Sequence, residues 1–241
     1  MPRARRLQSA AEWTEIATTA ADWKAADPVL LATMLGQLHL IRAFEETVLE
    51  LAGEGLVHGP AHSSIGQEGG AVGSIVSLRS ADAVNGSHRG HHQFLAKSLT
   101  HVTKGAGDLR QLVTPEVQEV LQRTLAEILG LAQGYCAGRG GSMHLQWLEA
   151  GALGTNAIVG GGVPMAAGNA WAQQHSGTSD ITVTYFGRPS AIARPLRWHR
   201  SDGSSSLTNG GRQRGTKLAS GSRVARQENR VLTSHSSRPG P

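Results

Sequence analysis

The regular spacing of apolar residues stops at Gly187, and this boundary limits how much of the chain can build a hydrophobic core. Before it, apolar side chains recur at helical spacing, and the β-branched and aromatic run 181–186 has the composition of a buried strand. After it, Ser, Gly and Arg dominate without an amphipathic period, which is typical of a segment without a core. We therefore expect one α/β domain followed by a disordered tail.

The predicted helices carry apolar residues three or four positions apart. Asp27 and Pro28 form a cap and first-turn pair, and Gly53 ends the long helix that follows them. Trp13 and Trp23 would anchor a shorter helix before it. Helices are expected at 11–23, 28–53, 66–78, 114–134 and 164–174, and strands at 84–87 and 181–186. Many helices and few strands favour an α/β layer architecture with a mostly parallel sheet.

The charge is divided unevenly along the chain. Residues 1–187 hold 12 Lys and Arg against 16 Asp and Glu, whereas residues 188–241 hold 11 against two. We expect an N-terminal helical extension at 1–27, a partial domain at 28–187 and a basic low-complexity tail at 188–241. The tail could attract nucleic acid weakly through phosphate, but it holds one aromatic residue, Trp198, and no recognisable module. We rank nucleic-acid binding last.

Membrane insertion and disulfide bonding are not expected. No apolar stretch is long enough to cross a bilayer, and the basic start of the chain leads into no apolar signal core. The single cysteine, Cys136, leaves no internal disulfide and fits a reducing cytoplasm, which is the expected location. Because no neighbouring residue activates it, we interpret Cys136 as a packing side chain.

Two polar clusters lie in the first half of the chain. Residues 62–68, HSSIGQE, place His62 and Gln67 at the mouth of a small-residue helix that favours an anion, although a capped helix start with a surface histidine explains this cluster better when it is taken alone. Residues 87–92, SHRGHH, offer His88, Arg89 and His91, and a guanidinium can fork onto phosphate oxygens. No acid or thiol lies nearby, so we rank phosphate contact first, a solvated loop second and a metal third.

Two further clusters are rich in glycine. Residues 139–144, RGGSMH, hold Ser142 and His144 in a loop that could press against a ligand, although an ordinary turn explains this cluster better when it is taken alone. Residues 157–164, AIVGGGVP, lead into a helix and could expose backbone groups to a planar ring or a phosphate. Ile158 and Val159 could equally belong to the core. The order and spacing of the four clusters carry more information than any one of them.

Taken in order, HxxxGQE, HRGH, GRGGSMH, IVGxxVP and a strand ending in YFG resemble the alpha subunit of the thiamine-diphosphate-dependent decarboxylating (dehydrogenase) component of 2-oxo acid dehydrogenase complexes. The pyruvate, branched-chain and acetoin members share this series. The resemblance covers residues 28–187 and implies the thiamine-diphosphate-binding fold, with a mostly parallel sheet flanked by helices, truncated here at its C-terminus. It implies oxidative decarboxylation of a pyruvate-like 2-oxo acid, or acetoin cleavage, in which the cofactor's thiazolium ring accepts the electrons.

The resemblance also implies partners and site residues. A beta subunit would complete the site, and a lipoyl-bearing acyltransferase would receive the product. Arg89 matches the family's diphosphate-binding arginine, and Val159 matches the residue whose backbone meets the aminopyrimidine ring. The implied catalytic residues are His62 and His91. The implied cofactor-binding residues are Gln67, His88, Arg89, Ser142, His144, Ile158, Val159, Gly160 and Gly187, and none is assigned to a metal.

The resemblance breaks directly after Gly187. In the family the strand continues as Asp-Gly and opens a motif whose Asp and later Asn hold magnesium, which prefers hard oxygen ligands. Here Arg188 and Pro189 follow, and Asn209 stands in a Ser/Gly run that we do not assign to metal. The family activity is therefore expected to be impaired, and the alternative is a non-catalytic remnant able to contact a beta-type partner. A changed reading frame at codon 188 would explain the break, with a natural disordered tail as the other explanation.

Overall fold

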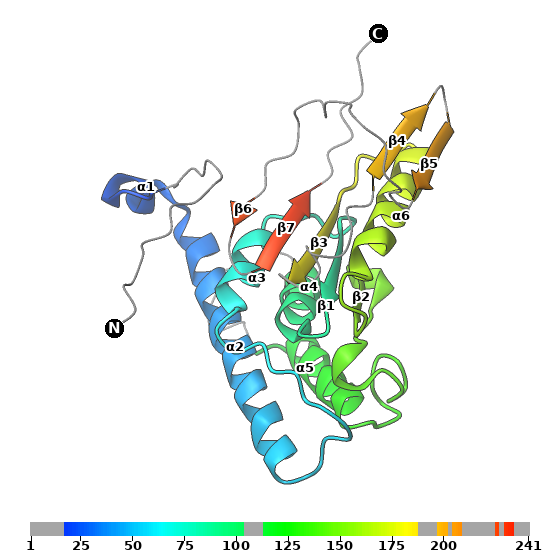
Figure 1. Cartoon of the computed structure of the whole chain (residues 1–241). Helices are drawn as coiled ribbons and strands as arrows, with labels where there is room; N and C mark the ends of the chain where they lie inside the picture. Colours follow the sequence, from blue (N-terminus) through cyan, green and yellow to red (C-terminus); the bar gives the residue numbers. More distant parts are fainter. Residues whose placement is uncertain are drawn as a thin grey trace, which may run out of the picture.

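The computed structural model describes residues 17–103 and 113–187, together with the backbone of four short segments between residues 197 and 233. Its centre is a sheet in the order β2-β1-β3-β7-β6 (Figure 1). Three strands belong to the predicted domain: β1 (Ala83–Ser87), β2 (Ala152–Asn156) and β3 (Thr182–Gly187). β1 runs parallel to both neighbours, with Val84 opposite Val183 and Ser87 opposite Asn156. The predicted α/β class with a parallel sheet flanked by helices is confirmed.

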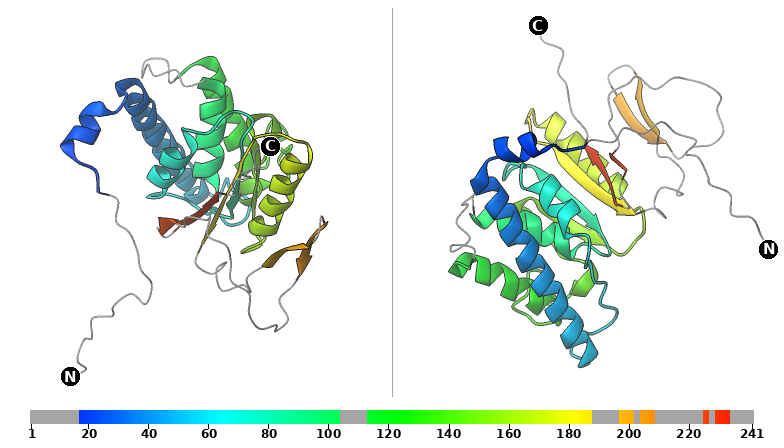
Figure 2. Two further views of the ribbon diagram at one scale, coloured as in Figure 1. Left: turned by 90° about the horizontal axis from the view of Figure 1, so that it is seen from above. Right: turned by 90° about the vertical axis from the view of Figure 1, so that its left-hand side faces the viewer.

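Helices cover both faces of this sheet (Figure 2). α4 (His91–Thr103) packs on β1 and β2, whereas α6 (Gly162–His175) packs on β3 and β1. Side chains alternate between the faces of a strand, so Val84 and Gly86 face α4 while Asn85 faces α6 and donates through Nδ2 to Gly162 O at 2.7 Å. The two helices therefore lie on opposite faces of β1.

α4 is the centre of the larger layer. The helices around it are α2 (Pro28–Gly53), α3 (Glu68–Ile75) and α5 (Pro115–Ile128). Every residue from His91 to Leu99 is buried, because neighbours surround this part of the helix on all sides. The core joins α2, α4, α5 and the sheet through Ile41, Phe44, Val48, Phe94, Leu95, Leu99, Val117, Val84 and Val183.

Two helices begin at the capping residues that the sequence predicts. Asp27 accepts a hydrogen bond from Val29 N at 2.9 Å and Pro28 opens α2, which ends at Gly53 as expected. Thr114 accepts one from Val117 N at 3.3 Å at the start of α5. α5 ends at Ile128, before the predicted stop near 134, because Gly130 adopts a left-handed φ of +75° and turns the chain away.

Other predictions need correction. α1 spans only Ala20–Ala25, and Trp23 is 59% exposed, so it anchors nothing; Trp13 lies outside the described residues. α4 and β2 were not predicted, because the first half of α4 is polar and β2 (ALGTN) lacks a β-branched run.

Regular structure also occurs after Gly187, where none was predicted. The strands are β4 (Arg197–Ser201), β5 (Ser204–Thr208), β6 (Ala225–Arg226) and β7 (Asn229–Thr233), and β7 pairs antiparallel with β3. The remaining residues of 188–241 lie outside the described part, so disorder of the tail stays a prediction. In the described part of the chain, no helix has both the length and the apolar character that a membrane span requires.

Candidate functional site

The carboxyl ends of the three parallel strands bring separate clusters to one edge of the sheet. β1 ends at Ser87, β2 at Asn156 and β3 at Gly187, and the parallel registers place these ends at the same edge. The loop after β1 carries His88 and Arg89, and the loop after β2 carries residues 158–160. Ligands of open parallel sheets bind outside the carboxyl ends of the strands. This edge is therefore the candidate site.

Two imidazoles and a guanidinium form its polar part. The ring centroids of His62 and His88 lie 5.0 Å apart in an edge-to-face arrangement, and Arg89 Nη1 donates to Ser63 O at 3.3 Å. Burial, helped by the nearby His62 and Arg89, lowers the pKa of His88, so its imidazole is neutral at pH 7. His88 Nδ1 is buried and has no hydrogen-bond partner among the described residues. An orphaned polar atom beside an exposed guanidinium fits an anionic ligand.

The glycine-rich loop after β2 turns its apolar side chains outward. Asn156 Oδ1 accepts from Ile158 N at 2.8 Å, Gly161 N donates to Ile158 O at 2.9 Å, and Gly160 adopts a φ of +82°. This tight turn leaves Ile158 71% and Val159 49% exposed, so the interpretation of these two as core residues is wrong. Exposed apolar groups of this kind suit a planar ring or a protein partner.

The RGGSMH segment is shaped by a buried carboxylate that no motif marks. Glu127 Oε2 accepts from Cys136 N at 2.7 Å and from Gly138 N at 3.0 Å, and its Oε1 accepts from Gly140 N at 2.6 Å. These bonds fold the chain into η2 (Gly141–Met143). Burial and the nearby Glu127 raise the pKa of the Cys136 thiol, which disfavours the thiolate needed by a nucleophile.

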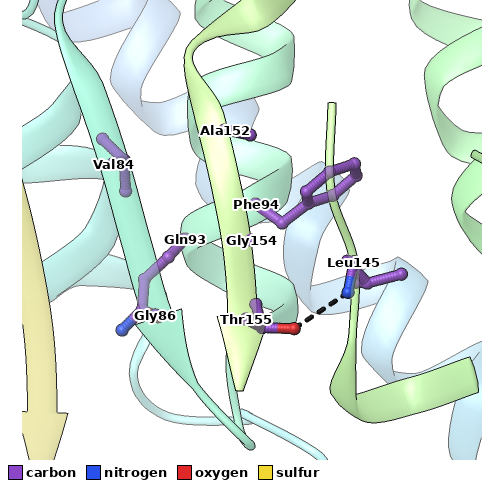
Figure 3. A pocket seen from close by; sticks show the side chains of 8 residues that line it. All are labelled: Val84, Gly86, Gln93, Phe94, Leu145, Ala152, Gly154 and Thr155. Atoms are coloured by element: carbon purple, nitrogen blue, oxygen red, sulfur yellow. Dashed lines mark hydrogen bonds between the residues drawn. The ribbon is translucent and has the colours of Figure 1, made fainter. Parts of the chain in front are cut away.

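The same segment is tied to β2 through Thr155. Its Oγ1 donates to Met143 O at 2.7 Å and accepts from Leu145 N at 2.9 Å, the second bond being drawn in Figure 3. Behind it lies a small internal void between β1, β2 and α4, lined by Val84, Gly86, Gln93, Phe94, Leu145, Ala152, Gly154 and Thr155 (Figure 3). The void has room for about one water molecule, so it belongs to the core and is not a substrate site.

Three of the predicted residues meet around a second buried carboxylate, Glu45 of α2. His91 Nδ1 lies 2.8 Å from Glu45 Oε1, and His91 Nε2 lies 2.9 Å from Ser142 O. His62 N donates to Ser142 Oγ at 3.2 Å. Sequence reasoning missed Glu45, because its neighbour Glu46 is an exposed acid of the same helix and no motif marks either of them. A single acid on the apolar face of a helix was the available signal.

The remaining predicted site residues make fewer contacts with the other groups of the candidate site. Gln67 is half-buried at the start of α3, where its backbone N donates to Ser64 O at 3.0 Å. The expected anion site at this helix start is filled by the chain itself, because Glu68 Oε2 accepts from Gly66 N at 2.9 Å. The side chain of His144 is exposed. Gly187 ends β3, opposite Asn229 of β7.

The interpretation of 87–92 as a basic loop holds for its first residues only. His91 and His92 begin α4 and are 0% and 1% exposed, so neither can reach a ligand at the surface. Burial lowers the pKa of His92 to about 4, so this imidazole is neutral. Within residues 17–103 and 113–187, no three His, Cys, Asp or Glu side chains are grouped to hold a metal.

Comparison with known proteins gives a consistent picture. A family model described as "Dehydrogenase E1 component" matches residues 36–192. The chain is 37% identical over 147 residues to the alpha subunit of acetoin:2,6-dichlorophenolindophenol oxidoreductase of Bacillus subtilis, covering 61% of this chain and 38% of the relative. It is 34% identical over 167 residues to the pyruvate dehydrogenase E1 component subunit alpha of Zymomonas mobilis, covering 69% and 42%. The chain thus spans about two fifths of the length of these relatives.

Proposed function

Because the chain belongs to the dehydrogenase E1 component family, we propose that it is an alpha-type subunit whose sheet edge binds thiamine diphosphate. The observation that carries this proposal is the meeting of the His88–Arg89 loop and the 158–160 loop at the carboxyl edge of β1 and β2. One loop offers a guanidinium and an orphaned imidazole nitrogen, and the other offers backbone beside exposed apolar side chains. A charged diphosphate and a planar ring need these two environments in one ligand.

Each loop has a separate task in this proposal. Arg89 would fork onto diphosphate oxygens, and the neutral His88 would donate one hydrogen bond from its orphaned nitrogen. The backbone around Val159 would meet the aminopyrimidine ring, with the turn at Gly160 holding it open to the ligand. When bound, the cofactor supplies the electron sink for breaking the bond next to a 2-oxo carbon.

The substrate would be a 2-oxo acid or acetoin, as the names of the relatives suggest. A beta-type subunit would cover the exposed apolar side chains of the loop after β2, which are Ile158 and Val159. Apolar groups gathered on one surface mark places of protein association. A lipoyl-bearing acyltransferase would then take up the product.

Calorimetric titration of the full chain with thiamine diphosphate, with and without magnesium, tests the proposal. We expect binding by the wild type and a loss of roughly tenfold or more for Arg89→Ala, since a charge-assisted bond to phosphate is removed. Arg123→Ala is the control, because it removes the same charge from α5, where Arg123 packs over Tyr135 at 4.2 Å. Equal affinities of the two variants would contradict the assignment of Arg89.

A second candidate, a non-catalytic remnant, is favoured by Arg188 at the position where the family carries its magnesium aspartate. For this candidate the titration should be silent with and without magnesium, while a beta-type partner is still captured. The coding DNA across codons 180–241 should also be read in all three frames. A family-like Asp-Gly continuation after a single-base correction would support the changed reading frame, and its absence from all frames would exclude it.

A further inference from the structure

Glu45 occupies a closed position between the segments that carry the predicted site residues. Its side chain and that of His91 are both 0% exposed. The Glu45 Oε1 atom lies 2.8 Å from His91 Nδ1 and accepts from Ser64 Oγ at 3.0 Å, and Oε2 accepts from Ser64 N at 3.0 Å. Burial alone would raise the pKa of Glu45, but its bonds to His91 and Ser64 outweigh burial and lower it. Independently of His91, the bonds donated by Ser64 N and Ser64 Oγ favour the ionised form of this carboxylate.

The other side of the His91 ring faces oxygen atoms as well. Nε2 lies 2.9 Å from Ser142 O and 2.9 Å from Ser142 Oγ. A carbonyl oxygen can only accept, so a lone pair on Nε2 would be repelled and Nε2 must carry a proton. Nδ1 must carry one too, since its partner is an ionised carboxylate. A ring with protons on both nitrogens is an imidazolium, and burying it requires the paired, fully bonded surroundings seen here.

From these contacts we infer that Glu45 is a positioning residue, which holds His91 as an imidazolium and fixes the Ser142 segment through it. Ser142 Oγ in turn accepts from His62 N at 3.2 Å, so one chain of contacts joins α2, α4, η2 and the segment before α3. Further titratable groups near this pair are His92 of α4, Glu68 of α3, which is paired with Arg42, and His62, whose backbone bonds Ser142. The effect on the cofactor rests on the proposed function, but the charge of His91 does not.

Glu45→Gln removes the negative charge of this side chain while keeping almost the same shape, so it tests the effect of the charge alone. With its amide turned, the Gln oxygen accepts from Ser64 N, and its NH₂ donates to Ser64 Oγ and to an unprotonated His91 Nδ1. All polar groups stay paired once His91 loses one proton and keeps the other on Nε2. Glu50→Gln is the matched control, because Glu50 lies on the exposed face of the same helix.

The experiment is ¹⁵N NMR of the histidine-labelled full chain at neutral pH, with a His91→Asn spectrum to identify the signals of His91. We expect two protonated ring nitrogens in the wild type and in Glu50→Gln, and one in Glu45→Gln. An unprotonated His91 nitrogen in the wild type would overturn the inference, even if the Glu45 variant did not fold.

Thiamine diphosphate titration then tests positioning, with an expected affinity roughly tenfold lower for Glu45→Gln than for Glu50→Gln, as for the loss of one charge-assisted hydrogen bond. Equal affinities would overturn the positioning role. A wild-type chain that shows the His91 imidazolium but binds no cofactor would contradict the proposed function alone.

Discussion

The two ends of the parallel strands differ in how their polar groups are used. At the amino ends of β1 and β3, Asp82 accepts from Arg79 N at 2.8 Å, from Arg79 Nη2 at 2.8 Å and from Ile181 N at 3.0 Å. Lys97 Nζ donates to Arg79 O at 2.7 Å in the same network. At the carboxyl ends, His88 Nδ1 is buried without a partner among the described residues, and Ile158 and Val159 are exposed.

Stability and ligand binding place opposite demands on the two ends of this small sheet. Buried polar groups with complete partners hold elements together, whereas orphaned polar groups and exposed apolar ones cost free energy unless a ligand or partner covers them. We therefore interpret the amino end as the structural end of the sheet and the carboxyl end as the edge of the proposed binding site. The predictions below test this division.

Replacing Asp82, at the amino ends of the strands, should cause the largest loss of stability. Asp82→Ala leaves Ile181 N without its acceptor and Lys97 without its nearby negative charge, so we expect unfolding to become easier by about 3 kcal/mol. Urea denaturation measures this. Glu119→Ala, an exposed acid of α5, is the control and should stay within about 0.5 kcal/mol. If Asp82→Ala lowered the free energy of unfolding no more than Glu119→Ala does, the amino end of the sheet would not be the stabilising end.

Acid should weaken the fold through His92, the imidazole buried directly behind the binding loop. Its pKa is lowered to about 4 in the folded chain, against about 6.5 unfolded, so the unfolded state binds more protons between these values. Its contribution is fully present above pH 6.5 and is lost as pH falls toward 4, by about 3 kcal/mol. Denaturation midpoints across this window should fall less steeply for His92→Leu. The same slope in both proteins would contradict the assignment.

The turn that presents Val159 should tolerate a side chain poorly. Gly160 has a φ of +82°, a conformation that costs other residues about 1–2 kcal/mol, so Gly160→Ala should destabilise by about that amount. Gly168→Ala is the control, because this helical position is open and a Cβ there meets nothing. Weaker thiamine diphosphate binding by Gly160→Ala would show that the turn serves the ligand as well as the fold, whereas no change in either property would contradict its proposed role.

Arg89 should have the smallest effect on the fold. Its side chain is exposed and makes one long bond, to Ser63 O at 3.3 Å, so Arg89→Ala should change the free energy of unfolding by no more than about 0.5 kcal/mol. Arg89→Ala should therefore lose affinity for thiamine diphosphate but little stability, whereas Asp82→Ala should lose mainly stability. A strongly destabilised Arg89→Ala protein would mean that the carboxyl end of the sheet also stabilises the fold.

Local sequence patterns were enough to predict an element where its own residues stabilise it. Asp27 and Pro28 start α2, a helical apolar period carries it to Gly53, and the run 181–186 marks β3, because caps and periodicity act over a few residues. The order of the motifs was likewise sufficient to identify the family, since it is a property of the chain alone.

The tertiary structure decided which of these residues are buried and whom they meet. It buried His91 against Glu45 from 46 positions earlier, turned Ile158 and Val159 outward, and used Glu127 to fold the RGGSMH segment. Burial and hydrogen-bond partners depend on residues far apart in the sequence, so no local pattern contains them. The sequence by itself therefore determined the capped and periodic elements and the family, whereas packing determined α4, β2 and which buried polar groups have partners.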